Sequence, residues 1–487
     1  MAKKITVLLR IISAMLAVSL LSSCGLIVIN YPKDSAETTA QTETETETEA
    51  LTEEDPKYKI LRRDSSALAR KYLKTIDKTD YTGAVVKIAS VVPSLTDPDK
   101  APQVISKAVA RRNQLVKEKL GVSLVTVSTD ATALFAELSA SAKSGMYYTD
   151  LMLVPQNSVA SFAASGLLFN LRSMPNLDLS EEYFNKSSVA ALAAGYNAYG
   201  VAAHATLTPY TLPAMYFSAD RLRGLGLSLP YQTVKDGKWT WDAYNKLTVD
   251  VGEWNKLTLG DCGDFCVDAA FASVGGKFVS AGVMTSPTVA VTTEGSTPLL
   301  DIIMPAFADE KAITGEWASS QAFRDSAVFM IDTLDRMQTL TPKDGDTMGR
   351  WGIVPMPKAT EDAEYVTLAS PLSTVFAVPS IVASDERTAM VLRTVCAASA
   401  DRLPIAYREH TQNEMLPDNE SALMLEMITD SVVYDFVYTA GSMYPEAQEA
   451  SNYVVRNTVL YWTDLTYQLD MTVPAAEDVL RTAFPMG

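Results

Sequence analysis

The chain has 487 residues, of which 47% are hydrophobic, and its formal net charge is -17. The hydrophobic fraction is ordinary for a soluble globular protein, and the length exceeds what one hydrophobic core usually holds. The acidic balance argues against nucleic acid or anionic lipid headgroups as partners, because like charges repel. We therefore expect a protein of two domains that does not bind nucleic acid.

The first residues, "MAKKITVLLRIISAMLAVSLLSSCGL", have the organisation of an export signal. A basic start precedes an apolar run over residues 11–21, which is too short to span a bilayer. The Leu-Ser-Ser-Cys string that ends at Cys24 resembles a bacterial lipobox, in which cleavage leaves a lipid-modified N-terminal cysteine. We expect residues 1–23 to be a lipoprotein signal peptide and Cys24 to be the anchor on the extracellular face of the cell membrane. An ordinary signal peptide with an incidental cysteine is the alternative.

Residues 35–55, "SAETTAQTETETETEALTEED", carry many carboxylates and no aromatic residue. Such a segment cannot bury enough apolar surface to offset its ordering entropy, which predicts a disordered tether. A metal-binding acidic tail is the alternative, although alternating Thr and Glu supply charge without a fixed cage. Residues 24–79 are therefore expected to comprise the lipidated cysteine, the tether and a lead-in helix.

Three cysteines remain once Cys24 is assigned to lipid. Cys262 and Cys266 stand four residues apart and could form a disulfide within a loop. A zinc site would need two more ligands, which nothing nearby supplies, so we expect no metal and no other cofactor. Cys396 lies in an apolar pattern typical of a helix and is expected to be a buried thiol.

Strands and helices alternate from residue 84 onward. A β-branched run over residues 84–92 is followed by a Pro/Asp-rich loop and a helix over about 103–120, which Gly121 ends. A strand at 123–128, a further helix and an apolar run at 150–154 come next. This order is typical of a parallel sheet with covering helices.

In such sheets ligands bind beyond the carboxyl ends of the strands. The sequence therefore points to two loops, at residues 94–97 and 155–158, the second of which is predicted as a turn.

Trp239 and Trp241 stand one residue apart before a helical pattern. Thr240 is a good N-cap, and Trp241 and Tyr244 recur on one face of the helix that follows. The pattern predicts that Trp241 belongs to the core and that Trp239 packs against the helix as a hydrophobic staple. Stacking of Trp239 on a sugar ring is the alternative.

Four stretches, in this order, resemble the extracellular solute-binding proteins of ABC importers, in particular the family 1, sugar-binding lipoproteins of Gram-positive bacteria. They are "YTDLMLVPQNSVASFAASGLLFNL", "MYFSADRLRGLGLSLPYQTVKDGKWTWDAY", "WGIVPMPKATEDAEY" and "FAVPSIVASDERTAMVL". The resemblance implies an α/β protein with a two-lobed, periplasmic-binding-protein-like fold of type II. Each lobe would be a mainly parallel sheet flanked by helices, with the ligand cleft between the lobes.

The resemblance also implies the course of the chain. The N-lobe would comprise residues 80–213 and about 378–425, and the C-lobe residues 218–373 and about 430–487. The chain would cross between them near Met215 to Ser218 and near Thr374 to Pro379. Three positions depart from the common family pattern: Ser218 and Ala219 stand where Asn and Lys are frequent, and His204 stands where Asp is frequent.

By register with the family, solute contacts are expected from polar and aromatic residues just past strand ends. These are Ser94, Thr96, Asp97, Gln156, Asn157, Ser158, His204, Tyr210, Thr211, Asp264, Phe265 and Asp332. Each has an alternative role as an ordinary capping residue or as solvated polar surface. Trp317 and Trp351 are further candidates, and Trp351, beside a strand-like run, is more typical of a core residue.

The function that the resemblance implies is a lipid-anchored, monomeric receptor that binds a small solute, a carbohydrate first of all, and delivers it to an ABC permease. A surface lipoprotein for sensing or adhesion, or a binder of peptides or another non-sugar solute, is the alternative. An enzyme is not expected. The two histidines, His204 and His410, have no metal-ligand spacing, and no Gly-x-Ser-x-Gly elbow occurs.

Overall fold

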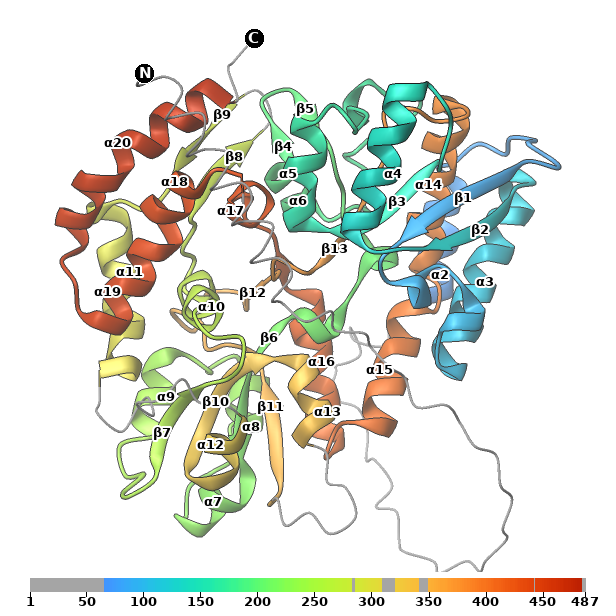
Figure 1. The fold of residues 1–487 in the computed structure, drawn as a ribbon. Coiled ribbons are helices and arrows are strands. Elements are labelled where there is room, and N and C mark those ends of the chain that lie inside the picture. The colour runs from blue at the N-terminus through green and yellow to red at the C-terminus, as the bar shows by residue number, and fades with distance from the viewer. Residues whose placement is uncertain (1–64, 283–284, 309–319, 341–348, 442, 484–487) are drawn as a thin grey trace, which may run out of the picture. The chain divides into compact units, whose positions relative to one another are not determined.

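The computed structural model describes residues 65–282, 285–308, 320–340, 349–441 and 443–483 (Figure 1). All of them belong to one compact unit. The predicted signal peptide, Cys24, the tether and Trp317 lie outside the described residues. Within the described residues, every helix is too short or too polar to cross a bilayer.

The first four-stranded sheet has the order β13-β3-β1-β2. Its strands are β1 (Val85–Ser90), β2 (Ser123–Ser128), β3 (Leu151–Pro155) and β13 (Thr374–Ala377), and helices α3 (Gln103–Leu120) and α4 (Ala131–Ser144) connect the first three. β1 is parallel to β2 and β3, whereas β13 is antiparallel to β3. The predicted alternation of strands and helices is confirmed. α3 ends at Gly121, whose φ of 73° suits a residue without Cβ.

The second four-stranded sheet has the order β11-β6-β10-β7. Its strands are β6 (Pro213–Ser218), β7 (Asn255–Leu259), β10 (Ala327–Thr333) and β11 (Trp351–Val354). β10 is parallel to β7, and β6 is antiparallel to both β10 and β11. Each sheet therefore has three strands in one direction and one reversed strand, β13 or β6. In both cases the reversed strand is the one that the chain forms on arriving from the other sheet.

The remaining elements cover the sheets and link them. They are α2 (Ser65–Lys74), α5 (Gln156–Ala164), α6 (Lys186–Ala191), β4 (Ala193–Ala194), β5 (Asn197–Ala198), α7 (Ala219–Gly224), α8 (Tyr231–Lys235), α9 (Trp241–Leu247), α10 (Phe265–Ser273), β8 (Val279–Gly282), β9 (Thr285–Val289), α11 (Thr293–Ala308), α12 (Ser320–Asp325), α13 (Met337–Leu340), β12 (Thr367–Leu368), α14 (Asp385–Ser399), α15 (Leu403–Glu414), α16 (Asn419–Asp430), β14 (Val432–Val433), α17 (Phe436–Ala440), α18 (Pro445–Gln448), α19 (Val454–Tyr461) and α20 (Leu465–Ala483). After β13 the chain packs α14 and α15 on α3, then α16 on β11, and finally α18 and α19 beside α20 (Figure 1). The C-terminal part of the chain thus contributes helices to both sheets.

Trp241 is a core residue, as predicted. It is fully buried at the start of α9, and its Nε1 donates a hydrogen bond to Ser273 Oγ at 3.0 Å. Thr240 caps this helix, because its Oγ1 accepts the N–H of Ala243 at 3.1 Å. The indole therefore joins α9 to α10 through its one donor and packs on Phe307 of α11 with its ring, at 6.1 Å between centroids.

Trp239 has the staple position predicted for it. It precedes the cap, and its ring packs edge-on against Tyr244 with centroids 6.2 Å apart. Its Nε1 donates to the carbonyl of Pro355 at 3.0 Å, and the side chain is 1% exposed. Burial excludes the alternative of sugar stacking. Trp351 is also buried, and Cys396 is a buried thiol whose pKa burial raises.

Replacing Trp241 with Ala is expected to lower the free energy of unfolding by about 3 to 5 kcal/mol, because it leaves a large cavity and removes the hydrogen bond to Ser273 Oγ. Trp462 is a matched control, since it is 60% exposed, and Trp462→Ala is expected to change stability by about 0.5 kcal/mol. Urea denaturation followed by circular dichroism measures both. Equal losses for the two variants would contradict the core role of Trp241.

Candidate functional site

In both sheets, the carboxyl end of a strand lies beside a connection that brings the chain from the other sheet. The last residue of β3, Pro155, pairs with Thr374 at the start of β13. Likewise Thr333, the last residue of β10, pairs with Pro213 at the start of β6. Each reversed strand therefore begins at the edge where its neighbour ends.

The two connections also touch each other. Thr211 Oγ1, just before β6, lies 3.1 Å from Ser373 Oγ, just before β13. Both carboxyl-end edges consequently border one region, which is where α/β sheets of this kind hold ligands. We take this region as the candidate solute site.

Gln156 ties the second connection to the first sheet. Its side chain is fully buried, and Nε2 donates to the carbonyl oxygens of Ala369 at 3.1 Å and Ser370 at 2.7 Å. Both of its amide hydrogens are thus used within the protein. Gln156 is placed at the site, but as a support for the residues 369–373.

Asn157 and Ser158 are half-buried and lie in the first turn of α5, not in a turn as the sequence predicted. The correction has a physical cause. The first N–H groups of a helix need acceptors, and here the carbonyls of Ser373 and Pro371 accept from Gln156 at 2.9 Å and Asn157 at 3.2 Å. The helix can begin directly after β3 because a segment distant in sequence caps it.

The predicted loop after β1 forms two short 3₁₀ turns. Ser94 and Thr96 are buried, whereas Asp97 is half-buried and caps the second turn with its carboxylate. Arg112 of α3, which is buried, donates from Nη1 to the carbonyl of Leu95 at 2.6 Å. Burial lowers the pKa of Arg112 to about 10, so it remains protonated at neutral pH. Of Ser94, Thr96 and Asp97, only Asp97 has a side chain exposed enough to contact a solute.

The first connection holds the next three predicted residues. Tyr210 is buried, with its hydroxyl 3.2 Å from Thr411 Oγ1 of α15. Thr211 is half-buried, and its Oγ1 also donates to the carbonyl of Thr208 at 2.9 Å. His204 is half-buried and begins a 3₁₀ turn at His204–Thr206. A second 3₁₀ turn, Pro209–Thr211, lies between it and β6.

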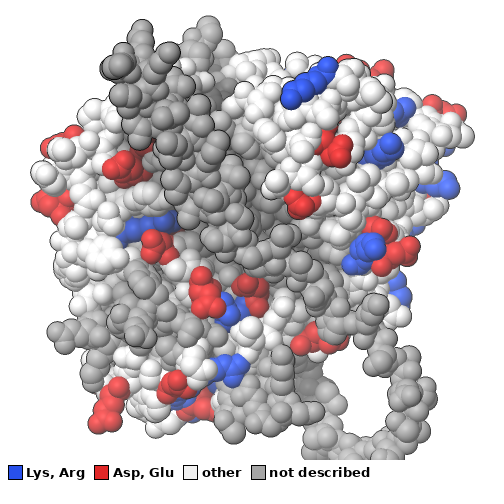
Figure 2. Space-filling view, in the orientation of Figure 1, with Lys and Arg blue, Asp and Glu red and all other residues white. Residues whose placement is uncertain are grey.

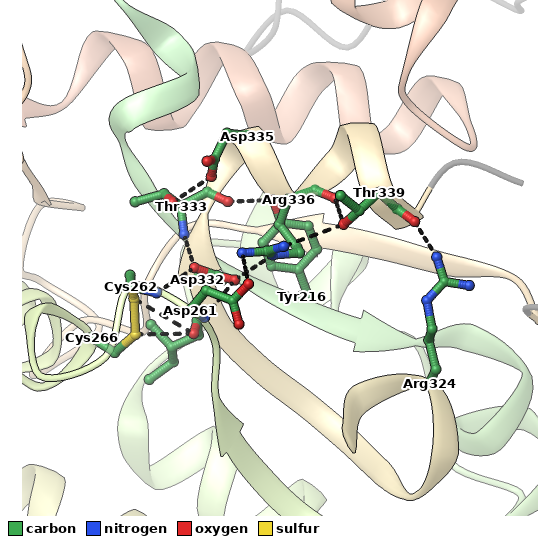
Figure 3. A network of polar contacts seen from close by, with 11 residues as sticks. Tyr216, Asp261, Cys262, Cys266, Arg324, Asp332, Thr333, Asp335, Arg336 and Thr339 are labelled. Atoms are coloured by element: carbon green, nitrogen blue, oxygen red, sulfur yellow. Dashed lines mark hydrogen bonds and ion pairs between the residues drawn. A yellow bond between two sulfur atoms is a disulfide. The ribbon is translucent and has the colours of Figure 1, made fainter. Parts of the chain in front are cut away.

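Asp332 is the centre of a polar network at the edge of the second sheet (Figure 3). Its fully buried carboxylate accepts the backbone N–H groups of Asp261 and Cys262, each at 3.1 Å, and Nε of Arg336 at 2.7 Å. Burial raises the pKa of Asp332, and the ion pair with Arg336 opposes that shift. The network holds the loop after β7 against the end of β10.

Cys262 and Cys266 form a disulfide that closes this loop (Figure 3). Asp264, inside the closed turn, is exposed and lies 3.8 Å from Nη1 of Arg456. Phe265 is buried and packs edge-on against Tyr438 at 5.6 Å. The turn therefore presents the Asp264 carboxylate outward and keeps Phe265 in the core.

Two residues of this edge were missed from the sequence. Asp261 is half-exposed, and its carboxylate lies 2.5 Å from Nη2 of Arg336. Asp332 and Arg336 stand four apart, the spacing of an ion pair on a helical turn, and this signal could have identified Arg336. Asp261 carries no such signal, because its partner is distant in sequence.

The described residues contain no group of three or more His, Cys, Asp or Glu placed to hold a metal ion. The face seen in Figure 2 shows acidic and basic side chains interspersed, without a broad field of one sign. The candidate site provides carboxylate, amide and hydroxyl groups, with arginines beside them, and these can form hydrogen bonds to a solute.

No protein-family model matches the sequence, and a search of curated proteins finds no match. Solved structures do share the fold. A cyclic alpha-maltosyl-1,6-maltose binding protein from Arthrobacter globiformis is 15% identical with a TM-score of 0.54, over 82% of this chain and 99% of its own. A cyclo/maltodextrin-binding protein complexed with maltotetraose is 13% identical with a TM-score of 0.53, over 82% and 97%.

The sugar-binding protein MalE from Xanthomonas citri is 11% identical with a TM-score of 0.52, over 82% of this chain and 98% of its own. Identities this low show the fold alone. The chain accordingly has the two-lobed, periplasmic-binding-protein-like α/β fold of these solute-binding proteins, which confirms the predicted fold class.

Replacing Asp332 with Ala is expected to lower the free energy of unfolding by about 3 to 5 kcal/mol, because Arg336 and three backbone N–H groups lose a buried partner. Asp335→Ala is the matched control. Asp335 is half-buried at the same strand end and accepts a bond from Thr333 Oγ1 at 2.5 Å, so a loss of about 1 kcal/mol is expected. Thermal and urea unfolding measure both. Unchanged stability with lost solute binding would instead make Asp332 a solute contact.

Proposed function

We propose that this protein is a receptor that binds a small carbohydrate between the carboxyl-end edges of its two sheets and delivers it to an ABC permease. The observation that carries the proposal is the contact between the connections at Thr211 and Ser373, which brings both edges to one region. A solute that touches both edges favours the arrangement in which they approach each other. The N-lobe would be residues 80–213 and about 378–425, and the C-lobe residues 218–373 and about 430–487.

The chemistry of the edges supports a carbohydrate. Sugar hydroxyls donate to carboxylates and accept from amides and hydroxyls. Side chains with surface at the two edges include Asp97, Asn157, Ser158, Thr211 and Asp264. We propose these five as direct contacts, with Gln156, Tyr210 and Asp332 as their supports. Two of the solved structures with this fold are described as binding cyclic alpha-maltosyl-1,6-maltose and maltotetraose.

We further propose that the receptor acts as a monomer and is held at the outer face of the membrane through lipid on Cys24. The support is the lipobox-like string and the apolar run before it. Each buried acyl methylene contributes about 0.8 kcal/mol, so several chains on one cysteine give lasting attachment. Binding and delivery, without catalysis, is the role that this arrangement suits.

Titration of the purified mature protein with maltotetraose, a cyclic maltosyl-maltose and a tripeptide tests the carbohydrate assignment. A bound sugar at about 100 times its dissociation constant is expected to stabilise the fold by about 2.7 kcal/mol, seen as a higher melting temperature. Asp264→Asn is expected to weaken that sugar by about 10-fold, whereas Asp242→Asn, an exposed residue of α9, leaves affinity unchanged. A shift with the peptide alone would contradict the carbohydrate assignment, and no shift with any solute would contradict the receptor.

Cells that express this chain are expected to incorporate labelled palmitate into it, and Cys24→Ala is expected to abolish the label because the residue proposed to carry the lipid is gone. Cys396→Ala is the control that keeps the label, since Cys396 is buried in the fold. Gel autoradiography of the membrane fraction is the measurement. Label that persists in Cys24→Ala would refute the anchor.

A further inference from the structure

Residues 431–435, called the strap below, link α16 to α17 and include the short strand β14. One edge of the strap pairs with the second connection. The N–H of Thr367 donates to the carbonyl of Ser431 at 3.0 Å, and the N–H of Ala369 donates to that of Val433 at 2.8 Å. The strap is thereby joined to the chain that enters the first sheet.

On the other edge of the strap, side chains form the hydrogen bonds to its backbone that a neighbouring strand would otherwise form. Asn185 Nδ2 donates to the carbonyl of Val432 at 3.0 Å, and Ser187 Oγ accepts the N–H of Tyr434 at 3.0 Å. Successive backbone groups of an extended segment point to opposite sides. The cap of α6 therefore satisfies the groups that β12 cannot reach.

Asn185 is itself fixed to the first sheet. Its N–H donates to the carbonyl of Ala202 at 2.8 Å, and its Oδ1 caps α6 by accepting the N–H of Ser188 at 2.9 Å. Val201, which precedes Ala202, exchanges two backbone hydrogen bonds of 2.9 Å with Phe376 of β13. The contact at Val432 is thus carried directly to the first sheet.

The last residue of the strap, Asp435, bonds to β8, a strand that itself packs against α6 and β4. The Asp435 carboxylate accepts the N–H groups of Phe278 at 2.9 Å and Val279 at 3.2 Å, at the start of β8. Burial raises the pKa of Asp435 to about 6, so the group is ionised at neutral pH. In α17, the Tyr438 hydroxyl donates to Asp268 of α10, which is also paired with Arg456 of α19. α10 follows directly on the disulfide turn of the second-sheet edge.

We propose that the strap sets the separation of the two lobes and that Asn185 is the positioning residue that holds it to the first. Within five residues, the strap is bonded to the α6 cap on one side and to β8 on the other. Loss of the Asn185 donor would weaken the hold on the first-sheet side and leave the bonds of Asp435 to β8 unchanged. The consequence for solute affinity rests on the proposed receptor function, whereas the consequence for lobe separation does not.

The test uses Asn185→Asp with Asn170→Asp as its matched control. In both variants the remaining Oδ1 keeps the helix cap, and the lost donor is replaced by an acceptor. Asn170 caps a 3₁₀ turn and donates from Nδ2 to Asn197 Oδ1 at 2.8 Å, on the first-sheet side only. Spin labels on Glu118→Cys of α3 and Gln232→Cys of α8, both exposed positions, report the separation by pulsed electron resonance without solute.

Wild type and Asn170→Asp are expected to give the same distance distribution, and Asn185→Asp a longer or broader one. Its affinity for maltotetraose is expected to fall about 3- to 10-fold, because a smaller fraction of molecules has the binding-competent arrangement. Ser187→Ala, which removes the acceptor for Tyr434, should move the distribution the same way, and circular dichroism confirms that each variant is folded. Identical distributions in all folded variants would overturn the proposal. No binding of maltotetraose by wild type bears on the proposed function alone.

Discussion

The contact between the two connections, at Thr211 and Ser373, is the constraint on which the arrangement of this protein depends. Each sheet places three strands in one direction, so their carboxyl ends share one edge. The chain leaves each sheet and enters the other at that edge, through the reversed strands β6 and β13. Because the connections touch, both edges must border the same region, and any solute there can contact both.

Several polar side chains in this region use their hydrogen-bonding groups to satisfy the backbone of the connections. The connections carry N–H and carbonyl groups that regular sheet pairing cannot satisfy, and leaving such groups buried and unpaired costs about 1 to 3 kcal/mol each. Gln156 meets this need for the residues 369–373, and Asp332 meets it for the loop after β7. Solute contacts are then left to the residues that surround these supports.

The same principle explains how parts distant in sequence are held together. The start of α5 is capped by carbonyls more than 200 residues away, and the open edge of β14 is paired by the side chains of the α6 cap. In both arrangements the N-terminus of a helix beside the first sheet, α5 or α6, contacts a distant segment of the chain. These segments are residues 371–373 and 432–434. Motion of one part against the other would have to break or carry these hydrogen bonds.

The sequence by itself determined much of the fold. Periodicity predicted α3 to its first and last residues, and the cap pattern predicted α9 with Trp241 in the core and Trp239 as its staple. These features depend on neighbours within a few turns, so local chemistry specifies them. Only the tertiary structure decided that Gln156 begins a helix, that Asp332 is buried beneath the disulfide loop, and that Asn185 reaches Val432. Each depends on a hydrogen-bond partner tens to hundreds of residues away, which sequence spacing does not reveal.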